Sequence, residues 1–243
     1  MSDIRIPLKL NKCPLVDALI EIRFKSDLDK SVIFGCIYSL IRESYPGPVV
    51  NLPITQIPSQ IRDNDPQLQF KPLYRIDGND TILQIGTDVI CISSKNPYIG
   101  WDVMSRRVLD VINKIQQGGI IKNVVRLGHR YVNFFDGIID EKLNMTLKLV
   151  NHYNISNSLI RFEISEGEYV STLQYSNSAA YKPNSSLIER KGSVIDIDTF
   201  RIYSGDYFLQ NIETEINTAH LIEKELFYSL LKEDFIKELE PVY

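Results

Sequence analysis

The sequence predicts an α+β fold in which two similar strand–helix–meander–helix halves form one curved antiparallel sheet with helices on one face. Three observations lead to this prediction. Apolar and polar residues alternate where each half begins, as in strands with one solvated face. Two long segments place apolar residues at helical spacing. The same order of elements occurs in residues 1–120 and in residues 121–243, without residue-level identity between them, so both halves are expected to form one structural unit.

The first half begins with a strand followed by a helix. Ala18, Ile20, Ile22 and Phe24 alternate with larger or charged neighbours, which is the period of a strand. Asp27 or Asp29 is suited to cap the helix that follows, because a short acidic side chain accepts hydrogen bonds from the first free backbone N–H groups. The stretch "SYPGP" ends this helix, since proline and glycine do not continue it.

An antiparallel meander and a second helix complete the first half. The stretch "VVNLPITQIP" predicts a proline-limited edge segment, and strands are expected in "LQFKPLYRI" and "TILQIGTDVICIS", joined by the turn "DGND". The segment "NPYIGWDVMSRRVLDVINKIQQGG" places its apolar residues on one side and ends in two glycines. This is the pattern of an amphipathic helix with a glycine stop.

The second half repeats this order. A strand is expected in "NVVRLGHRYVNFF", a helix opened by Asp140 in "DEKLNMTLKLVNHY", and a hairpin in "SLIRFEIS" and "YVSTLQYS". One or two strands follow in "SLIERKGSVIDIDTFRIYS", and a long terminal helix begins near Asp206. The element order resembles the duplicated helix-grip arrangement of TATA-binding-protein-like folds, a likeness that carries no function with it.

Composition limits the classes of function. The formal net charge is −4, which argues against a dedicated binder of duplex nucleic acid, because such proteins need a basic surface. The three cysteines, Cys13, Cys36 and Cys91, are far apart and form no CxxC pair, so buried free thiols in a reducing compartment are expected. No apolar run is long enough for a membrane span, and a cytoplasmic location is expected. No cofactor and no metal-ligand set is predicted.

The stretch "LGHRYVNFFDG" carries polar groups in a segment that otherwise predicts a strand. Alternation places His129, Tyr131 and Asn133 on the face that also holds apolar residues, and Arg130 on the other face. We expect Tyr131 and Asn133 to be buried and hydrogen-bonded, with Glu21 or Arg23 as neighbours, because buried polar groups need partners. Such a network pins the junction of the halves or lines a polar pocket. Arg130 could receive an acidic partner.

The stretch "GSVIDIDTF" places two carboxylates on one strand face. Gly-Ser near Asp-x-Asp is typical of nucleotidyltransferases, but that chemistry needs a loop and a helix between the two parts, and Ser193 and Asp196 are too close for them. Asp196 and Asp198 are therefore expected to form surface pairs with lysine or arginine, or a weak cation site. The predicted binding residues are Arg130, Tyr131, Asn133, Asp196 and Asp198, and no catalytic residue is predicted.

Four stretches in order along the chain resemble the serial motifs of a bacterial family of proteins of about this length. They are "CPLVDALIEIRF", "LQIGTDVICISSKNPYIGWDVMSRRV", "RLGHRYVNFFDG" and "VIDIDTF". The family has a Pro-x-Val-(Glu/Asp)-Ala-x-x-Glu-Ile-Arg-Phe opening, a Tyr-x-x-Trp helix entry and an Arg-Tyr-x-Asn strand. Its sporadic distribution implies carriage on accessory or mobile DNA near defence genes, and its shared Arg130, Tyr131 and Asn133 imply a common core or pocket. His129 departs from the pattern.

Two hypotheses of function follow. The first is a non-catalytic module that binds a protein partner through an open sheet face or a helix groove, as exposed sheet faces and edges do. The alternative is an enzyme acting on nucleotides or small metabolites, with His129, Arg130, Asp196 and Asp198 converging in a polar pocket. The first is favoured because no motif has the spacing of a metal, phosphate or nucleophile site. The sequence leaves the oligomeric state open.

Overall fold

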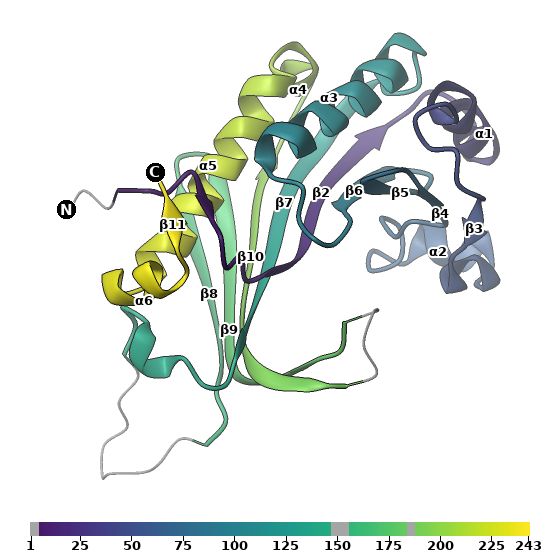
Figure 1. The fold of residues 1–243 in the computed structure, drawn as a ribbon. Coiled ribbons are helices and arrows are strands. Elements are labelled where there is room, and N and C mark those ends of the chain that lie inside the picture. Colours follow the sequence, from purple (N-terminus) through teal and green to yellow (C-terminus); the bar gives the residue numbers. More distant parts are fainter. Residues whose placement is uncertain (1–4, 147–155, 184–187) are drawn as a thin grey trace. The chain divides into compact units, whose positions relative to one another are not determined.

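The computed structural model describes residues 5–146, 156–183 and 188–243. The strands are β1 (Lys9–Leu10), β2 (Leu15–Lys25), β3 (Val50–Asn51), β4 (Tyr74–Asp77), β5 (Thr81–Ile85), β6 (Val89–Ser94), β7 (Asn123–Asp136), β8 (Leu159–Glu166), β9 (Tyr169–Tyr181), β10 (Arg190–Ile202) and β11 (Pro241–Val242). The α-helices are α1 (Lys30–Ile41), α2 (Ser59–Asn64), α3 (Trp101–Gln117), α4 (Tyr207–Gln210), α5 (Ile212–Leu230) and α6 (Glu233–Glu238). Figure 1 shows these elements along the chain.

Within the described residues, one large antiparallel sheet has the strand order β3-β4-β5-β6-β2-β7-β10-β9-β8, and β1 pairs with β11 separately. The predicted α+β class with a large antiparallel sheet is confirmed. The chain divides into two compact units: unit 1 is residues 1–16, 130–199 and 220–243, and unit 2 is residues 17–129 and 200–219. Both β7 and α5 contribute residues to each unit.

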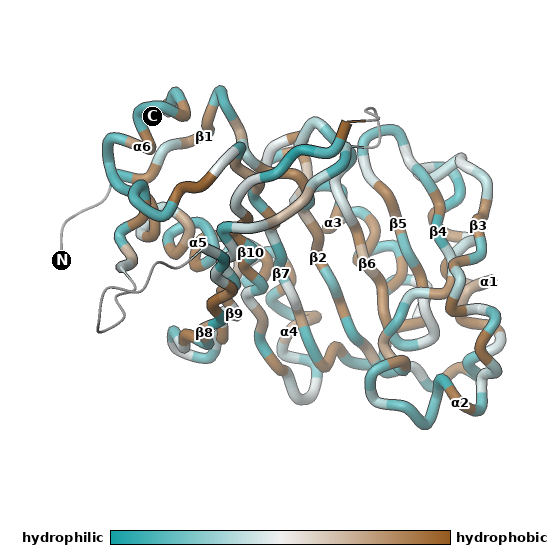
Figure 2. Tube along the Cα trace, turned by 90° about the horizontal axis from the view of Figure 1, so that it is seen from below, coloured by the Kyte–Doolittle hydropathy of each residue, from teal (hydrophilic) through white to brown (hydrophobic). Residues whose placement is uncertain are grey.

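Unit 2 follows the predicted periodicities closely. Ala18, Ile20, Ile22 and Phe24 of β2 are all buried, and their alternating neighbours are not. Asp29 caps α1, accepting a hydrogen bond from the backbone N–H of Ser31 at 2.8 Å. The helix α3 buries Met104, Val108, Val111, Ile112 and Ile115, and ends before Gly118. Figure 2 shows apolar residues recurring along β5 and β6. Local pattern therefore accounts for β2, α1 and α3 of this unit.

Three predictions in unit 2 differ from the structure. The stretch "TILQIGTDVICIS" forms two strands, β5 and β6, because the chain turns at Gly86, whose N–H donates to the Val89 carbonyl at 2.8 Å. A Cβ at Gly86 would lie 2.9 Å from the Lys71 carbonyl oxygen, so the turn requires glycine. In "LQFKPLYRI" the strand begins only at Tyr74, and "VVNLPITQIP" gives β3 and then the 3₁₀ helix Pro53–Gln56.

Unit 1 has its own core, between β7, β9 and β10 and the end of α5 with α6. The residues of this core are Phe135, Ile139, Leu143, Leu173, Tyr175, Ile195, Ile197, Phe227, Tyr228, Leu231, Phe235, Ile236 and Leu239. The predicted hairpin is confirmed as β8 and β9, and "SLIERKGSVIDIDTFRIYS" gives the single strand β10. The predicted terminal helix is divided into α4, α5 and α6.

The helix expected from Asp140 is not formed in its described part. Asp140–Lys142 is a 3₁₀ helix, and Leu143 then forms a β-bridge with Leu231. Residues 147–155, with His152, lie outside the described residues. Of the cysteines, Cys91 is buried as expected and Cys36 is partly buried, but Cys13 is exposed. No helix in the described parts of the chain is long and apolar enough to cross a membrane.

Candidate functional site

An ion pair joins β7 and β10 on the open face of the sheet in unit 1. Arg130 Nε donates to Asp196 Oδ1 at 2.8 Å, and its Nη2 donates to Asp196 Oδ2 at 2.6 Å. The arginine side chain is 44% exposed and the aspartate only 13%. Two parallel hydrogen bonds fix the guanidinium plane, which is the geometry that makes arginine selective for carboxylates. The predicted surface pair of Asp196 with an arginine is confirmed.

This ion pair borders a shallow polar hollow. The hollow has a volume of about 420 Å³ and is lined by Arg130, Arg161, Thr172, Gln174, Asp196 and Asp198. The lining residues come from four neighbouring strands, β7, β8, β9 and β10, at positions whose side chains share one face. Three of the five predicted binding residues, Arg130, Asp196 and Asp198, are therefore brought together.

Tyr131 and Asn133 point to the other face of β7 and do not join this hollow. Tyr131 is 8% exposed and Asn133 is 4% exposed, as predicted. The Tyr131 ring meets the ring of His220 on α5 edge-on, with 5.8 Å between the centroids. The predicted neighbour Glu21 bonds elsewhere, to Arg23 and Arg126 within unit 2. Successive residues of a strand face opposite ways, so the polar run of β7 serves two different surfaces.

His129 does not converge with Asp196 and Asp198. It is fully buried, and its ring packs edge-on against the ring of Trp101 of α3, within unit 2, with 5.2 Å between the centroids. Its neighbour Arg130 is on the opposite, open face of β7. A general base must be within hydrogen-bond reach of the group it serves. Strand alternation therefore places His129 and Arg130 on opposite faces of β7.

A partly buried histidine, His220, and a buried glutamate, Glu223, lie on α5 within unit 1. A ring nitrogen of His220 and a carboxyl oxygen of Glu223 lie within 4.8 Å of one another. Burial raises the pKa of the Glu223 carboxyl well above its usual range, and burial lowers the pKa of His220 to about 3. His220 is therefore neutral near pH 7, and burial favours the protonated form of Glu223. Sequence reasoning missed Glu223, although it lies between Ile216 and Phe227 in the buried stripe of this helix.

The same open face in unit 2 carries another set of charges. Glu21 of β2 accepts from Arg23 Nε at 2.7 Å and from Arg126 Nη1 at 2.6 Å. Arg23 also covers the ring of Phe70 at 4.7 Å, and Arg126 covers that of Phe200 at 4.6 Å. The charged groups of these side chains all have partners within unit 2. We therefore interpret them as stabilising the pairing of the strands and not as a binding site.

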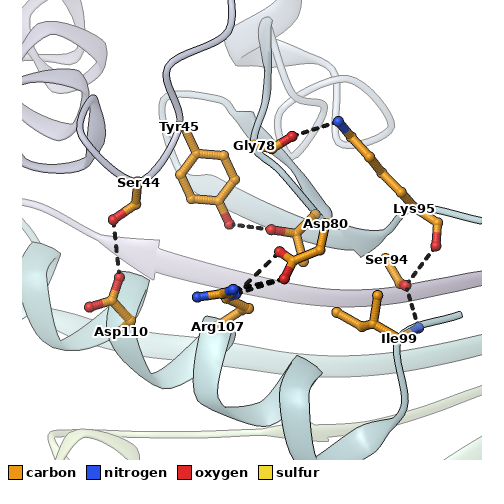
Figure 3. A network of polar contacts seen from close by, with 10 residues as sticks. Ser44, Tyr45, Gly78, Asp80, Ser94, Lys95, Ile99, Arg107 and Asp110 are labelled. Carbon is orange, nitrogen blue, oxygen red and sulfur yellow. Dashed lines mark hydrogen bonds and ion pairs between the residues drawn. The ribbon is translucent and has the colours of Figure 1, made fainter.

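A second polar network of unit 2 joins α3 to the turn between β4 and β5 (Figure 3). Arg107 binds both oxygens of Asp80 and donates from Nη2 to Oδ2 at 2.7 Å. The Arg107 guanidinium holds the pKa of the Asp80 carboxyl below its usual range. Tyr45 shares a hydrogen bond of 3.0 Å with Thr81 in the interior. Each of these polar groups has a partner within the network. The network therefore holds the predicted "DGND" turn against α3.

A hollow of about 500 Å³ opens at the start of α1. Its one lysine, Lys30, is bound to Asp63 at 3.3 Å and to Asp88 at 3.1 Å. Lys30 is therefore already paired with carboxylates, and Arg62, which also lines the hollow, donates to the Ile54 carbonyl at 3.4 Å. The hollow beside Arg130 is bordered by two arginines, whose side chains are 44% and 59% exposed.

No protein-family model and no curated protein matches the chain. The sequence motifs and the geometry of the described residues therefore carry the functional argument.

Proposed function

We propose that the protein is a non-catalytic binding module that holds an acidic segment of a protein partner on the open sheet face of unit 1. The observation that carries this proposal is the shallow hollow where Arg130 and Arg161 stand beside Asp196 and Asp198. The bordering guanidinium groups are 44% and 59% exposed. Arginine is enriched at protein interfaces, because its planar group both stacks and forms paired hydrogen bonds.

The arrangement suits recognition better than catalysis. Arg130 is held in place by the two hydrogen bonds that it donates to Asp196, so its orientation is set before a partner arrives. Such preorganisation reduces the entropy lost on binding. His129, the base that a catalytic site would need, is on the other face of β7. The hollow is also shallow, whereas reactions on small molecules are favoured by enclosed sites that exclude water.

The experiment compares two matched variants in a pull-down from a lysate of the source organism. Arg130→Ala removes the guanidinium at the hollow. Arg190→Ala removes an arginine with the same 44% exposure, which pairs with Asp136 away from the hollow. The wild type and Arg190→Ala should capture the same protein, and Arg130→Ala should lose it. Equal capture by all three chains, each with its melting temperature checked, would contradict the proposal.

The enzyme alternative makes a different prediction in the same study. A thermal-shift screen with Mg²⁺ and nucleotides is expected to leave the melting temperature of the wild type unchanged. A ligand that binds the folded state raises it by mass action. A rise that depends on Mg²⁺ or a nucleotide, with no protein captured, would favour an enzyme acting on nucleotides or small metabolites.

We also propose that the protein is a cytoplasmic, accessory protein of the bacterial family whose motifs it resembles, carried near defence or mobile-element genes. The Pro14–Phe24 opening and the Arg130-Tyr131-x-Asn133 strand support this proposal. We further infer an internal duplication of the TATA-binding-protein-like kind. The strand order supports this inference. Outward in the sheet, β2 is followed by β6, β5, β4 and β3, and β7 is followed by β10, β9 and β8, so each first strand is followed by later strands in reverse chain order.

A further inference from the structure

The strand β8 is an edge of the large sheet that is neither short nor interrupted by proline. It has eight residues and contains no proline. The strand at the opposite edge, β3, has only two residues, and Pro53 lies two positions after its end. Proteins commonly shorten their edge strands or place proline on them, because an exposed strand edge pairs with other strands. Within the described residues, β8 has β9 as its single strand neighbour in the sheet (Figure 2).

The register with β9 determines which backbone groups of β8 face outward. The Ser158 carbonyl accepts a hydrogen bond from the Asn177 N–H at 3.3 Å, in line with the pairing of Leu159 opposite Ser176. In an antiparallel ladder the N–H and C=O of one residue point the same way, and direction alternates along the strand. The backbone N–H and C=O groups of Ile160, Phe162 and Ile164 therefore point toward β9. The residues 159, 161, 163 and 165 present their backbone groups at the open edge.

We propose that β8 pairs antiparallel with β8 of a second copy of this chain, about a two-fold axis at Phe162. In this register Arg161 is opposite Glu163 of the other copy, and Glu163 is opposite its Arg161. The two side chains are 59% and 61% exposed, and within one chain they already bond to each other at 2.9 Å. Opposite charges directly across two strands stabilise the pairing. Each copy therefore supplies both halves of the same charge pattern, as a two-fold interface requires.

The apolar residues of β8 fit the same register. Phe162 is opposite itself, and Ile160 is opposite Ile164 of the second copy. Phe162 is 43% exposed and Ile164 is 39% exposed, whereas Ile160 packs against the core of unit 1. Pairing of aromatic and β-branched residues across strands is favourable, and here it extends that core across the edge. The outward backbone groups add about eight hydrogen bonds between the copies.

Neighbouring registers are disfavoured by charge. An axis at Glu163 places the two Glu163 carboxylates opposite each other, and an axis at Arg161 does the same with the two guanidinium groups. Like charges directly opposite are destabilising. Registers shifted by one residue would bring outward backbone groups against inward ones, so they form no ladder. The sequence of β8 therefore selects the axis at Phe162.

Sedimentation equilibrium of the full chain tests the proposal. The wild type should be in equilibrium between monomer and dimer, with a Kd on the order of micromolar, as for a small interface. Arg161→Glu and Glu163→Arg each replace two attractive pairs by two repulsive ones. Each variant alone should raise the Kd at least about tenfold, equivalent to about 1.4 kcal/mol. A wild type that is monomeric at every concentration would overturn the proposal.

Two further samples separate the register from a general effect of charge. Mixing Arg161→Glu with Glu163→Arg places opposite charges at every facing position, so the mixture should dimerise as the wild type does. The double variant R161E/E163R should also recover the wild-type Kd. Failure of both samples, with melting temperatures at the wild-type value, would refute this register. Arg130→Ala should leave the Kd unchanged, so loss of the partner and loss of the dimer are separate outcomes.

Discussion

Replacing Glu223 by glutamine should change how the free energy of unfolding depends on pH. Glu223 is 1% exposed on α5, and its Oε1 has no hydrogen-bond partner among the described residues. Burial raises the pKa of its carboxyl well above the usual value of 4.5. In the folded state the group therefore keeps its proton, while in the unfolded chain it ionises as pH rises through 4.5. Rising pH consequently favours the unfolded state of the wild type.

The magnitude follows from the difference in bound protons between the two states. Between the unfolded and the folded pKa, one proton is bound in the folded state and none in the unfolded state. The wild type then loses up to about 1.4 kcal/mol of stability per pH unit. Glu223→Gln keeps the shape of the side chain and removes this dependence. The stability of the variant relative to the wild type should therefore rise by more than about 1 kcal/mol between pH 5 and pH 7.

Urea denaturation at pH 5, 6 and 7 measures this difference. Glu225→Gln is the matched control, because Glu225 is an exposed residue of the same helix, and it should stay within about 0.5 kcal/mol of the wild type at each pH. A difference between Glu223→Gln and the wild type that is the same at all three pH values would refute a protonated Glu223. It would mean that the folded state holds the carboxylate in its ionised form.

Three more outcomes are expected. Burial lowers the pKa of His220 from 6.5 to about 3. The wild type should therefore lose stability as pH falls below 6.5, and denaturation of His220→Gln should show a smaller loss, whereas an equal loss would exclude this cause. Asn133→Ala should cost about 1–3 kcal/mol, because the partners of a buried amide lose their hydrogen bonds, and an unchanged urea midpoint would contradict that network. Gly192→Ala places a Cβ 1.9 Å from the Phe135 carbonyl oxygen and should cost about 3 kcal/mol or more in thermal unfolding. Gly35→Ala meets nothing within 4 Å in α1, so it should raise stability by up to about 1 kcal/mol, and equal effects of the two glycine variants would contradict the steric argument.

Local periodicity predicted most of the strands and helices of this protein and the orientation of many side chains, but not the 3₁₀ helix at Asp140 or the division of the terminal helix. The alternation in β2 correctly separated its buried and open faces, and in β7 it placed Tyr131 and Asn133 on the buried face and Arg130 on the open one, although Gly128 and Phe134 are also buried. Of the two candidate caps, Asp27 and Asp29, Asp29 caps the helix. These features depend on residues that are two to four positions apart, so they can be read from a short stretch of sequence. The turn at Gly86 was missed, because its glycine is required by contact with Lys71, whose position the stretch does not reveal.

The sequence by itself determined the α+β class, the face that Arg130 takes on β7 and the burial of Tyr131 and Asn133. The tertiary structure alone decided the partners. Arg130 and Asp196 are 66 residues apart, and their pairing depends on β7 and β10 becoming neighbours in the sheet. It also decided that Glu223 loses contact with water and that β8 is left at an edge. The physical reason is that a side chain's direction follows from its own backbone, whereas its neighbours and its solvation follow from packing between segments that are distant along the chain.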